Sequence, residues 1–168
     1  MKKDFLISVL AVLENDCDII EDFVRETSQV LSTEFTYYEI VLIDNGSQDF
    51  TDQKIISLQA DIPNLRLIRL SRKHDLETAL AAGLENSLGD YAVIIDVSSD
   101  PPQLIPKLIE TAIQGNDVVI AIRKNRENQS FIRRYLAIIF YKIASNLLGY
   151  SLQPNATHFR VFSRQVVN

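Results

Sequence analysis

The sequence predicts an α/β fold in which a mainly parallel β-sheet is covered by helices on both faces. Short, almost continuously apolar runs recur along the chain, and each is followed by a longer segment with helical periodicity. The chain has 168 residues, of which 46% are hydrophobic and 23% charged, enough for one domain with a substantial core. We expect a single domain over residues 1–168 that continues in a larger protein.

The first three strand and helix units occupy the first half of the chain. Lysines followed by apolar residues open the sequence, as in a secretion signal, but no small-residue cleavage site follows and a strand explains the run equally well. Pro63 and Asn64 break the chain before the third strand. The expected strands span residues 5–12, 38–43 and 65–70, and the helices after them span residues 19–31, 52–60 and 76–87.

The second half of the chain continues the alternation. Gly89 and Gly115 mark turns before two further strands, and Pro101 suits the first turn of a helix. The expected elements are strands at residues 91–95 and 117–122, helices at 104–114 and 131–148, and a last strand with the start of a helix in FRVFSRQVVN. Right-handed crossovers would set the carboxyl ends of all strands along one edge, where open α/β sheets bind their ligands.

Charge and cysteine content exclude several classes of protein. A net charge of -5 argues against a nucleic-acid binder. A local basic stretch, residues 123–142, contains Glu127 as its only acid and suits either a phosphate-bearing partner or a solvated helix face. Cys17 is the only cysteine, so no internal disulfide is expected, and no apolar run reaches the roughly 18 residues of a spanning helix.

Common catalytic motifs are missing from the sequence. No glycine fingerprint follows the first strand, which excludes a dinucleotide-binding dehydrogenase, and no G-x-x-x-x-G-K-[ST] loop or G-x-S-x-G elbow occurs. His74 and His158 lie in neighbourhoods without metal-ligand spacing.

Polar side chains remain at the expected strand ends. Asp44 closes the second strand in EIVLIDNGSQD, and Asp96 closes the fourth in YAVIIDVSSDPP. Carboxylates and amides can read a base and a ribose, and arginine suits a diphosphate. The pattern therefore predicts a nucleotide-sugar site, although Asp-Asn-Gly-Ser also forms a tight turn without any ligand. The candidate residues are Asp44, Asn45, Ser47, Arg72 and Asp96.

Four stretches, in order along the chain, resemble motifs of the family 2 glycosyltransferases. IVLIDNGSQD resembles that family's D-D-G-S-x-D turn, and LSRKHDLETALAAGLENSLGD resembles its L-S-R-N-x-G-x-x-A-A-L-x-A-G-L segment. YAVIIDVSSDPPQLIPKLIE resembles D-A-D-L-Q-D-P-P-E-L-I-P, and HFRVFSRQVVN resembles D-F-R-L-L-S-R-x-V-V. The resemblance covers nearly the whole chain and is greatest to the polyprenyl-phosphate mannosyl- and glucosyltransferases.

This resemblance implies a GT-A fold, a three-layer α/β/α sandwich, and sugar transfer from a nucleotide-diphosphate sugar to a polyprenyl phosphate with inversion. It also implies a divalent cation, Mg²⁺ or Mn²⁺, and a cytoplasmic protein peripheral to the inner face of the membrane. By matching positions, the implied catalytic residues are Asp96 and His158, and the implied metal ligands are Asp96 and Asp100. The implied nucleotide-sugar residues are Leu13, Asn15, Asp44, Asn45, Ser47, Arg72 and Asp96, and the implied acceptor-phosphate residues are Arg123, Arg133, Arg134 and Arg160.

The departures from the family pattern fall on the chemistry. The family's Y-N-E after the first strand is replaced by Leu13-Glu14-Asn15, its D-x-D by Asp96-Val97-Ser98, and its acid before F-R-L by His158. Ser98 offers a neutral oxygen in place of an anion, so we expect weaker cation binding. Asp100 has a second interpretation as a helix cap, and His158 could serve as a base near neutral pH. A catalytically inactive binding or regulatory module is the alternative function, and a plain structural domain is the third.

The segment at residues 130–150 is apolar around most of its circumference yet carries Arg133, Arg134 and Lys142. This pattern is typical either of a helix that docks on an anionic membrane surface or of an ordinary core helix, and a core helix of this kind could also form the self-associating interface of a homo-oligomer.

Overall fold

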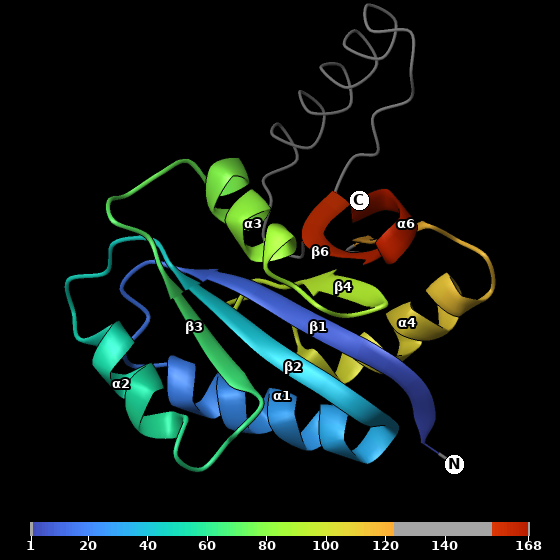
Figure 1. The fold of residues 1–168 in the computed structure, drawn as a ribbon, viewed down its shortest axis with the longest axis horizontal. Helices are drawn as coiled ribbons and strands as arrows, with labels where there is room; N and C mark the ends of the chain where they lie inside the picture. Colours follow the sequence, from blue (N-terminus) through green and yellow to red (C-terminus); the bar gives the residue numbers. More distant parts are fainter. Residues whose placement is uncertain (1, 123–155, 168) are drawn as a thin grey trace, which may run out of the picture.

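The described residues form one six-stranded sheet with helices on both faces (Figure 1). The computed structural model describes residues 2–122 and 156–167. The strands are β1 (Lys3–Leu13), β2 (Phe35–Asp44), β3 (Leu65–Arg69), β4 (Tyr91–Ile94), β5 (Val118–Ile122) and β6 (Ala156–Ser163). The helices are α1 (Ile20–Glu34), α2 (Thr51–Leu58), α3 (Leu76–Glu85), the short 3₁₀ helix η1 (Pro102–Leu104), α4 (Ile105–Ile113) and α6 (Arg164–Val167). Across the sheet the strand order is β3-β2-β1-β4-β6-β5, which puts β1 near the centre.

Each face of the sheet has its own core, because successive side chains of a strand point to opposite faces. On one face, Val9 and Leu42 belong to the larger cluster, which includes residues of α1, α2 and α4. α3 covers the other face (Figure 1), where Leu10 and Val41 pack with Ala79 of this helix. This arrangement confirms the expected three-layer sandwich with a mainly parallel sheet.

The last strand departs from the expected topology. β1 runs parallel to β2 and β4, and β2 runs parallel to β3, but β6 runs antiparallel to both β4 and β5. Ile122 at the end of β5 pairs with Ala156 at the start of β6, so the chain leaves and re-enters the sheet at the same edge. The expectation that all strands end at that edge is therefore wrong for β6, whose amino end lies there instead.

A partly buried ion pair, in which the glutamate is buried and the arginine is partly exposed, connects four parts of the chain on the α3 face. The carboxylate of Glu39, which is 6% exposed, accepts hydrogen bonds from Arg66 Nη1 at 2.6 Å, Ser8 Oγ at 2.6 Å and the Leu88 backbone at 2.7 Å. A Cβ at Gly89 would lie 2.6 Å from the Ser8 backbone nitrogen, so a side chain there would push the network apart. This network ties β1, β2, β3 and the turn before β4 together.

The expected helix at residues 131–148 lies outside the described residues, as do Arg123, Arg133 and Arg134. Among the helices that are described, none has the length and apolar character needed to cross a membrane.

Candidate functional site

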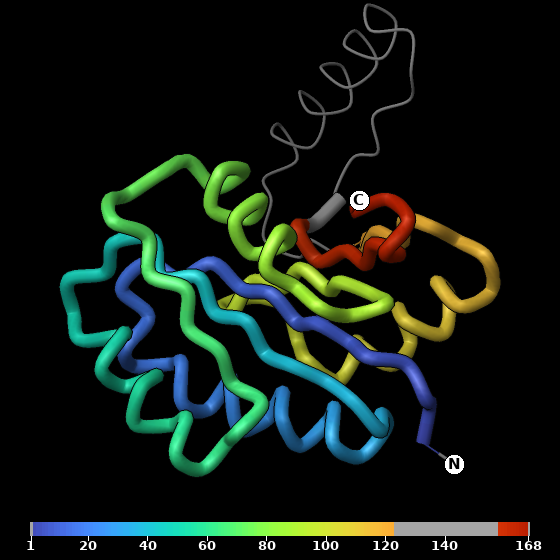
Figure 2. The backbone as a smooth tube through the Cα atoms, in the orientation of Figure 1, coloured from blue at the N-terminus to red at the C-terminus, as the bar shows by residue number. Residues whose placement is uncertain are grey.

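The loops that follow β1, β2, β3 and β4 meet at one edge of the sheet (Figure 2). Leu13 pairs with Asp44, and Asp44 pairs with Arg69, so β1, β2 and β3 end level with one another. β4 continues this edge on the other side of β1, where the Ile95 backbone N–H donates to Leu10 O at 3.0 Å. Asp44 and Asp96 therefore lie at the same edge, on strands that flank β1, as expected for the carboxyl ends of parallel strands.

Asp44 is 4% exposed and closes a tight turn. Its Oδ1 accepts a hydrogen bond from the Ser47 backbone N–H at 2.9 Å. Gly46, with φ +84°, supplies the left-handed backbone that the turn requires. Asp44 thus has a local structural role, while its second oxygen has no recorded hydrogen bond within the described residues.

Asn15 and Ser47 join the loops after β1 and β2. The Asn15 backbone N–H donates to Ser47 Oγ at 3.0 Å, and Asn15 Oδ1 accepts from the Gln48 backbone at 2.8 Å. Asn15 adopts φ 61°, a left-handed conformation that asparagine tolerates better than most residues. The side chain of Leu13 is fully buried in the core, so Leu13 contributes backbone and not a side chain to this edge.

Asn45 joins the loops after β2 and β3. Its Nδ2 donates to His74 O at 2.9 Å, and its Oδ1 accepts from the His74 backbone N–H at 2.9 Å. The amide is 4% exposed and holds both backbone groups of a residue 29 positions away.

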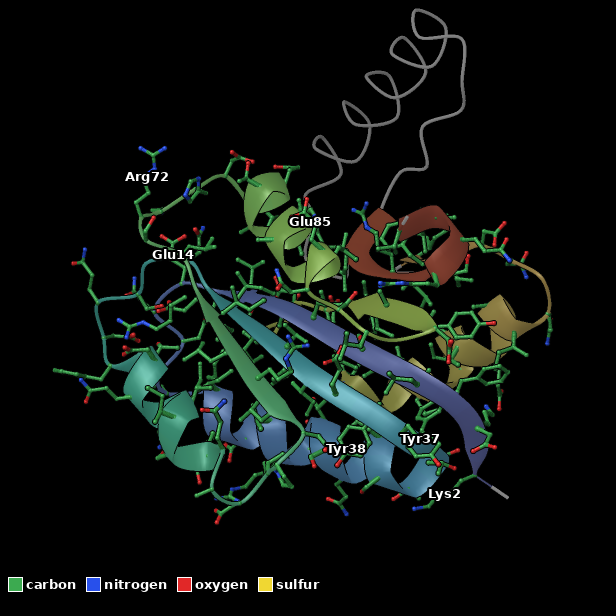
Figure 3. The ribbon with its side chains drawn as sticks, viewed as in Figure 1. Lys2, Glu14, Tyr37, Tyr38, Arg72 and Glu85 are labelled. Atoms are coloured by element: carbon green, nitrogen blue, oxygen red, sulfur yellow. The ribbon has the colours of Figure 1, made fainter. Side chains whose placement is uncertain are left out.

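Arg72 lies in the loop that Asn45 holds. It is exposed and projects away from the body of the domain, at the end where Glu14 also lies (Figure 3). The neighbouring Lys73 forms an ion pair with Glu14, which ties the loop after β3 to the loop after β1. The Arg72 guanidinium makes no recorded hydrogen bond or ion pair within the described part of the chain.

Asp96 is exposed just beyond β4 and receives hydrogen bonds from its own loop. Oδ1 accepts from the Ser98 backbone at 2.8 Å and from Ser98 Oγ at 2.6 Å. Partial burial would raise the pKa of Asp96, but hydrogen bonds from Ser98 and Ser99 outweigh it, so the pKa lies below its ordinary value. Asp96 is therefore an ionised carboxylate at neutral pH.

Asp100, expected as a second metal ligand or a helix cap, turns toward the same loop. Its Oδ2 accepts from the Asp96 backbone N–H at 3.1 Å, and the residue is 7% exposed. The residue that precedes η1 is Pro101, which makes no side-chain cap hydrogen bond. Within the described residues, no group of three or more His, Cys, Asp or Glu side chains is arranged to hold a metal ion.

Asp16 was not singled out from the sequence, yet it lies among the acids of this edge. Burial raises its pKa most, and the negative charges of Asp49, Asp96 and Glu14 raise it further, against a lowering hydrogen bond from the Glu14 backbone. Three acids stand at alternate positions in LENDCD, at Glu14, Asp16 and Asp18, and nothing in the sequence says which of them faces Asp96. The edge is thus acidic at its centre.

His158 and Arg160 lie on β6, at the opposite flank of β4 from β1. Arg160 pairs with Ile94 in the ladder, and its Nη2 lies 3.5 Å from His158 Nδ1. Arg160 Nε is buried without a hydrogen-bond partner in the part of the chain that the structure describes. These two expected site residues are brought to the edge that carries Asp96, whereas the expected acceptor-phosphate residues Arg123, Arg133 and Arg134 lie outside the described residues.

A hollow of about 560 Å³ adjoins this edge. It lies between the start of α1 and the loop after Asp96, and Asp22, Phe23, Ser98 and Ser99 are among its lining residues. Asp44 and Asp96 do not line it, so what the two aspartates share is the open edge of the sheet.

Comparison with known proteins gives the same family as the sequence motifs. Residues 9–168 match the family described as Glycosyl transferase family 2. A bactoprenol glucosyl transferase of Shigella phage SfX is 33% identical over 162 residues, covering 96% of this chain and 53% of the relative. A prophage bactoprenol glucosyl transferase homolog of Escherichia coli K12 is 35% identical over 165 residues, with coverages of 96% and 53%. The chain thus spans about half the length of these relatives.

Two solved structures share the fold of this chain, and one of them was determined with a nucleotide sugar. Glucosyl-3-phosphoglycerate synthase from Mycobacterium tuberculosis, in complex with Mn²⁺, UDP-glucose and phosphoglyceric acid, has a TM-score of 0.68 at 22% identity, covering 96% of this chain and 58% of that one. Mannosyl-3-phosphoglycerate synthase from Rubrobacter xylanophilus has a TM-score of 0.69 at 16% identity, with coverages of 96% and 54%. At these identities the likeness shows the fold alone, and it confirms the GT-A-like architecture.

Proposed function

Because the chain belongs to glycosyltransferase family 2, we propose that it transfers a sugar from a nucleoside-diphosphate sugar to a polyprenyl phosphate. Relatives at 33% and 35% identity are described as a bactoprenol glucosyl transferase and a homolog of one, and bactoprenol is a polyprenol. The observation that carries the proposal is the shared edge of Asp44 and Asp96. It supports the proposal because the two carboxylates stand on either side of β1, where one would contact the base and the other the diphosphate side of the donor. The transfer inverts the anomeric carbon, in keeping with the family resemblance.

The donor is proposed to lie across the ends of β2, β1 and β4. Asp44 would accept an N–H of the base through the oxygen that Ser47 leaves unused. Arg72 would reach the diphosphate from the loop after β3, where its exposed guanidinium offers several donors to phosphate oxygens. The residues proposed for the donor are Asp44, Ser47, Arg72 and Asp96, together with Leu13 and Asn15 through the loop after β1 and Asn45 through the loop after β3 that it holds.

A divalent cation fits this edge only if the phosphates of the nucleotide sugar supply further ligands. Asp96 is ionised, and its charge favours Mg²⁺ or Mn²⁺. Mg²⁺ is commonly held by one or two carboxylates together with substrate phosphates. Asp96 would therefore hold the ion, with Asp100 held to the loop backbone, and the ion would stabilise the charge that develops on the leaving diphosphate.

The acceptor phosphate does not need a general base to activate it for attack. A phosphate oxygen of the polyprenyl phosphate attacks the anomeric carbon, and the bond from that carbon to the diphosphate oxygen breaks with its electron pair on the nucleoside diphosphate. The attacking oxygen is already anionic, so no proton has to be removed. Arg160, together with Arg123, Arg133 and Arg134, is proposed to bind the acceptor phosphate, and His158 is proposed to lie beside the reacting atoms.

The reaction is proposed to take place at the cytoplasmic face of a membrane, where a polyprenyl phosphate resides. The basic residues of 123–142 would meet anionic headgroups. Flotation with anionic and neutral vesicles tests this localisation. Binding to the anionic vesicles alone, lost in the Arg133→Glu/Arg134→Glu variant, is expected, and equal indifference to both vesicle types would contradict it.

The decisive experiment is a transfer assay with purified protein. UDP-glucose and undecaprenyl phosphate in detergent micelles, with Mn²⁺, are expected to yield a lipid-linked glucose. Asp96→Asn should abolish the product, while Asn116→Asp, at the opposite edge of the sheet, should not. UDP binding without any product, over a panel of nucleotide sugars, would favour the second candidate function.

That second candidate is a binding or regulatory module that keeps the nucleotide pocket without transfer. The observation that favours it is the loop Asp96-Val97-Ser98, in which the second anion of D-x-D is absent and Ser98 bonds Asp96 itself.

A further inference from the structure

We propose that Asn45 is a positioning residue. It holds residues 71–74, the Arg72 loop, at the sheet edge where the nucleotide is proposed to bind, and position 45 requires an amide for this role. The inference rests on the proposed donor binding by Arg72. It differs from a direct contact between Asn45 and the nucleotide, which the family position alone would suggest.

The first observation is the geometry of the amide. Asn45 Nδ2 donates to His74 O and Asn45 Oδ1 accepts from the His74 backbone N–H, both at 2.9 Å. One side chain thus satisfies the donor and the acceptor of a single loop residue. With 4% exposure, these bonds are shielded from competing water.

The second observation is the close approach of the two loops. A Cβ at Gly46 would lie 3.3 Å from the Lys73 backbone nitrogen and 3.6 Å from Lys73 Cα. The residue after Asn45 therefore packs directly beneath the residue after Arg72. This contact is independent of the Asn45 amide, and it places the Arg72 loop against the turn that Asp44 closes.

The third observation is that the loop is fixed at both ends but not at Arg72. The Leu70 backbone N–H donates to Asp44 O at 3.0 Å, and Asp75 caps α3 by accepting from the Thr78 backbone N–H at 2.9 Å. Between these anchors, His74 is held by Asn45, while Arg72 is exposed. The two bonds from Asn45 to His74, here called the Asn45 clamp, thus limit where the Arg72 guanidinium can go, although the clamp does not contact the guanidinium.

An aspartate could not replace the amide at neutral pH. A carboxylate at position 45 would still accept from the His74 N–H, but it would set an oxygen against the His74 carbonyl oxygen in place of the N–H donor. A buried carbonyl would lose its partner and face a negative charge. The family's second aspartate in D-D-G-S-x-D is therefore incompatible with this conformation of the Arg72 loop, which requires an amide at position 45.

Calorimetry with UDP and Mg²⁺ tests the proposal through a double-mutant cycle. Asn45→Asp should weaken UDP binding by about tenfold, which corresponds to about 1.4 kcal/mol. In an Arg72→Ala background the same change should weaken it by less than about twofold, because the loop then has no guanidinium to position. Asn116→Asp is the control for a charge added elsewhere in the fold: it removes an exposed bond, from Nδ2 to Thr111 O at 2.7 Å, and adds the same charge far from the edge, so UDP affinity should stay unchanged.

Two outcomes would overturn the proposal. An undiminished tenfold loss in the Arg72→Ala background would mean that Asn45 acts on the nucleotide without Arg72. Unchanged UDP affinity in Asn45→Asp would mean that the clamp is irrelevant to binding.

Hydrogen exchange separates this proposal from the proposed function. Asn45→Ala removes both bonds and should speed amide exchange at residues 71–74, while the helix capped by Asp75 stays protected. Wild-type protein that fails to bind UDP would overturn the proposed function, and faster exchange in Asn45→Ala would then still establish the clamp. Exchange as slow as in the wild type would refute the clamp itself.

Discussion

Asp96 and His158 lie two residues beyond the same pair of the β4–β6 ladder, Ile94 with Arg160. Because β4 and β6 run antiparallel, residue numbers rise along β4 in the direction in which they fall along β6. Asp96 and His158 therefore lie at the same edge of the sheet. The position that carries an acid in the family motif is thus occupied by a histidine next to the strand end of Asp96. Any role for His158 in transfer follows from this placement.

Replacing His158 with alanine should reduce kcat for transfer to a polyprenyl phosphate by less than about tenfold. A general base typically contributes about 10²- to 10⁴-fold, and an anionic phosphate nucleophile needs none. Steady-state kinetics with saturating UDP-glucose and undecaprenyl phosphate measure the effect. A loss of about 100-fold or more, with unchanged UDP affinity, would contradict this prediction and show that His158 contributes to the transfer step itself.

Asp44 offers a cleaner test of base recognition through an isosteric change. Asp44→Asn keeps an oxygen for the Ser47 N–H but puts an NH₂ group in place of the second oxygen, which we propose accepts from the base. UDP binding should weaken by about 1 to 3 kcal/mol, the cost of leaving a buried polar group unpaired. Calorimetry measures the affinity, and thermal unfolding checks that the fold is retained. An unaltered UDP affinity with a retained melting temperature would remove Asp44 from the site.

The partly buried ion pair predicts a difference between two glutamates. Glu39→Gln should destabilise the domain by about 1.5 to 3 kcal/mol, the range for a lost hydrogen bond to a charged group, because the Arg66 side chain is 39% exposed and can be solvated. Glu110→Gln breaks the surface pair with Lys3 at 2.9 Å and should cost less than about 1 kcal/mol. Urea unfolding of both variants gives the comparison. Equal losses would mean that the Glu39 network contributes no more to stability than a surface ion pair.

The strand plan could be predicted from the sequence, because each element carries its own signal. Apolar runs ending in Asp44 and Asp96 gave the strand ends, and these residues are indeed brought to one edge. The antiparallel course of β6 could not be predicted, because an alternating apolar strand such as FRVF reads the same in either direction. The partnership of Asn45 with His74 was equally hidden, since a pair 29 residues apart leaves no mark in either local pattern.

Asp16 was missed for a related reason, because Asp49 and Asp96, which affect its pKa, are distant in the sequence and close to it only in the folded chain. The structure also predicts the direction in which the pKa of Asp16 shifts. Its pKa is raised by burial first and then by Asp49, Asp96 and Glu14, so the folded state disfavours its ionised form. As pH rises past the ordinary value of 3.8, the unfolded chain ionises first and stability is lost until the folded carboxyl also ionises.

Asp16→Asn removes this loss and keeps an oxygen for the Glu14 backbone N–H. The variant should therefore gain stability relative to the wild type at pH 7, and the gain should shrink as pH falls below 3.8. Thermal unfolding at both pH values, without divalent cations, measures the difference. A variant whose stability relative to the wild type is independent of pH would refute the electrostatic account of Asp16.

Restoring the second anion at position 98 should strengthen cation binding at this edge. In the wild type Ser98 Oγ donates a hydrogen bond to Asp96 Oδ1 at 2.6 Å. The serine therefore contributes no negative charge to the edge, and it engages a carboxylate oxygen that would otherwise be available to a cation. Ser98→Asp replaces a neutral oxygen with an anionic one, which hard cations prefer. Mn²⁺ affinity in the presence of UDP should rise by about tenfold, and Ser99→Asp, which adds the same charge one residue along the loop, should gain less. Electron paramagnetic resonance of free Mn²⁺ measures both variants, and equal gains would show that only the net charge of the loop matters. A gain specific to Ser98→Asp, accompanied by faster sugar transfer, would mean that the wild-type loop limits catalysis through its cation.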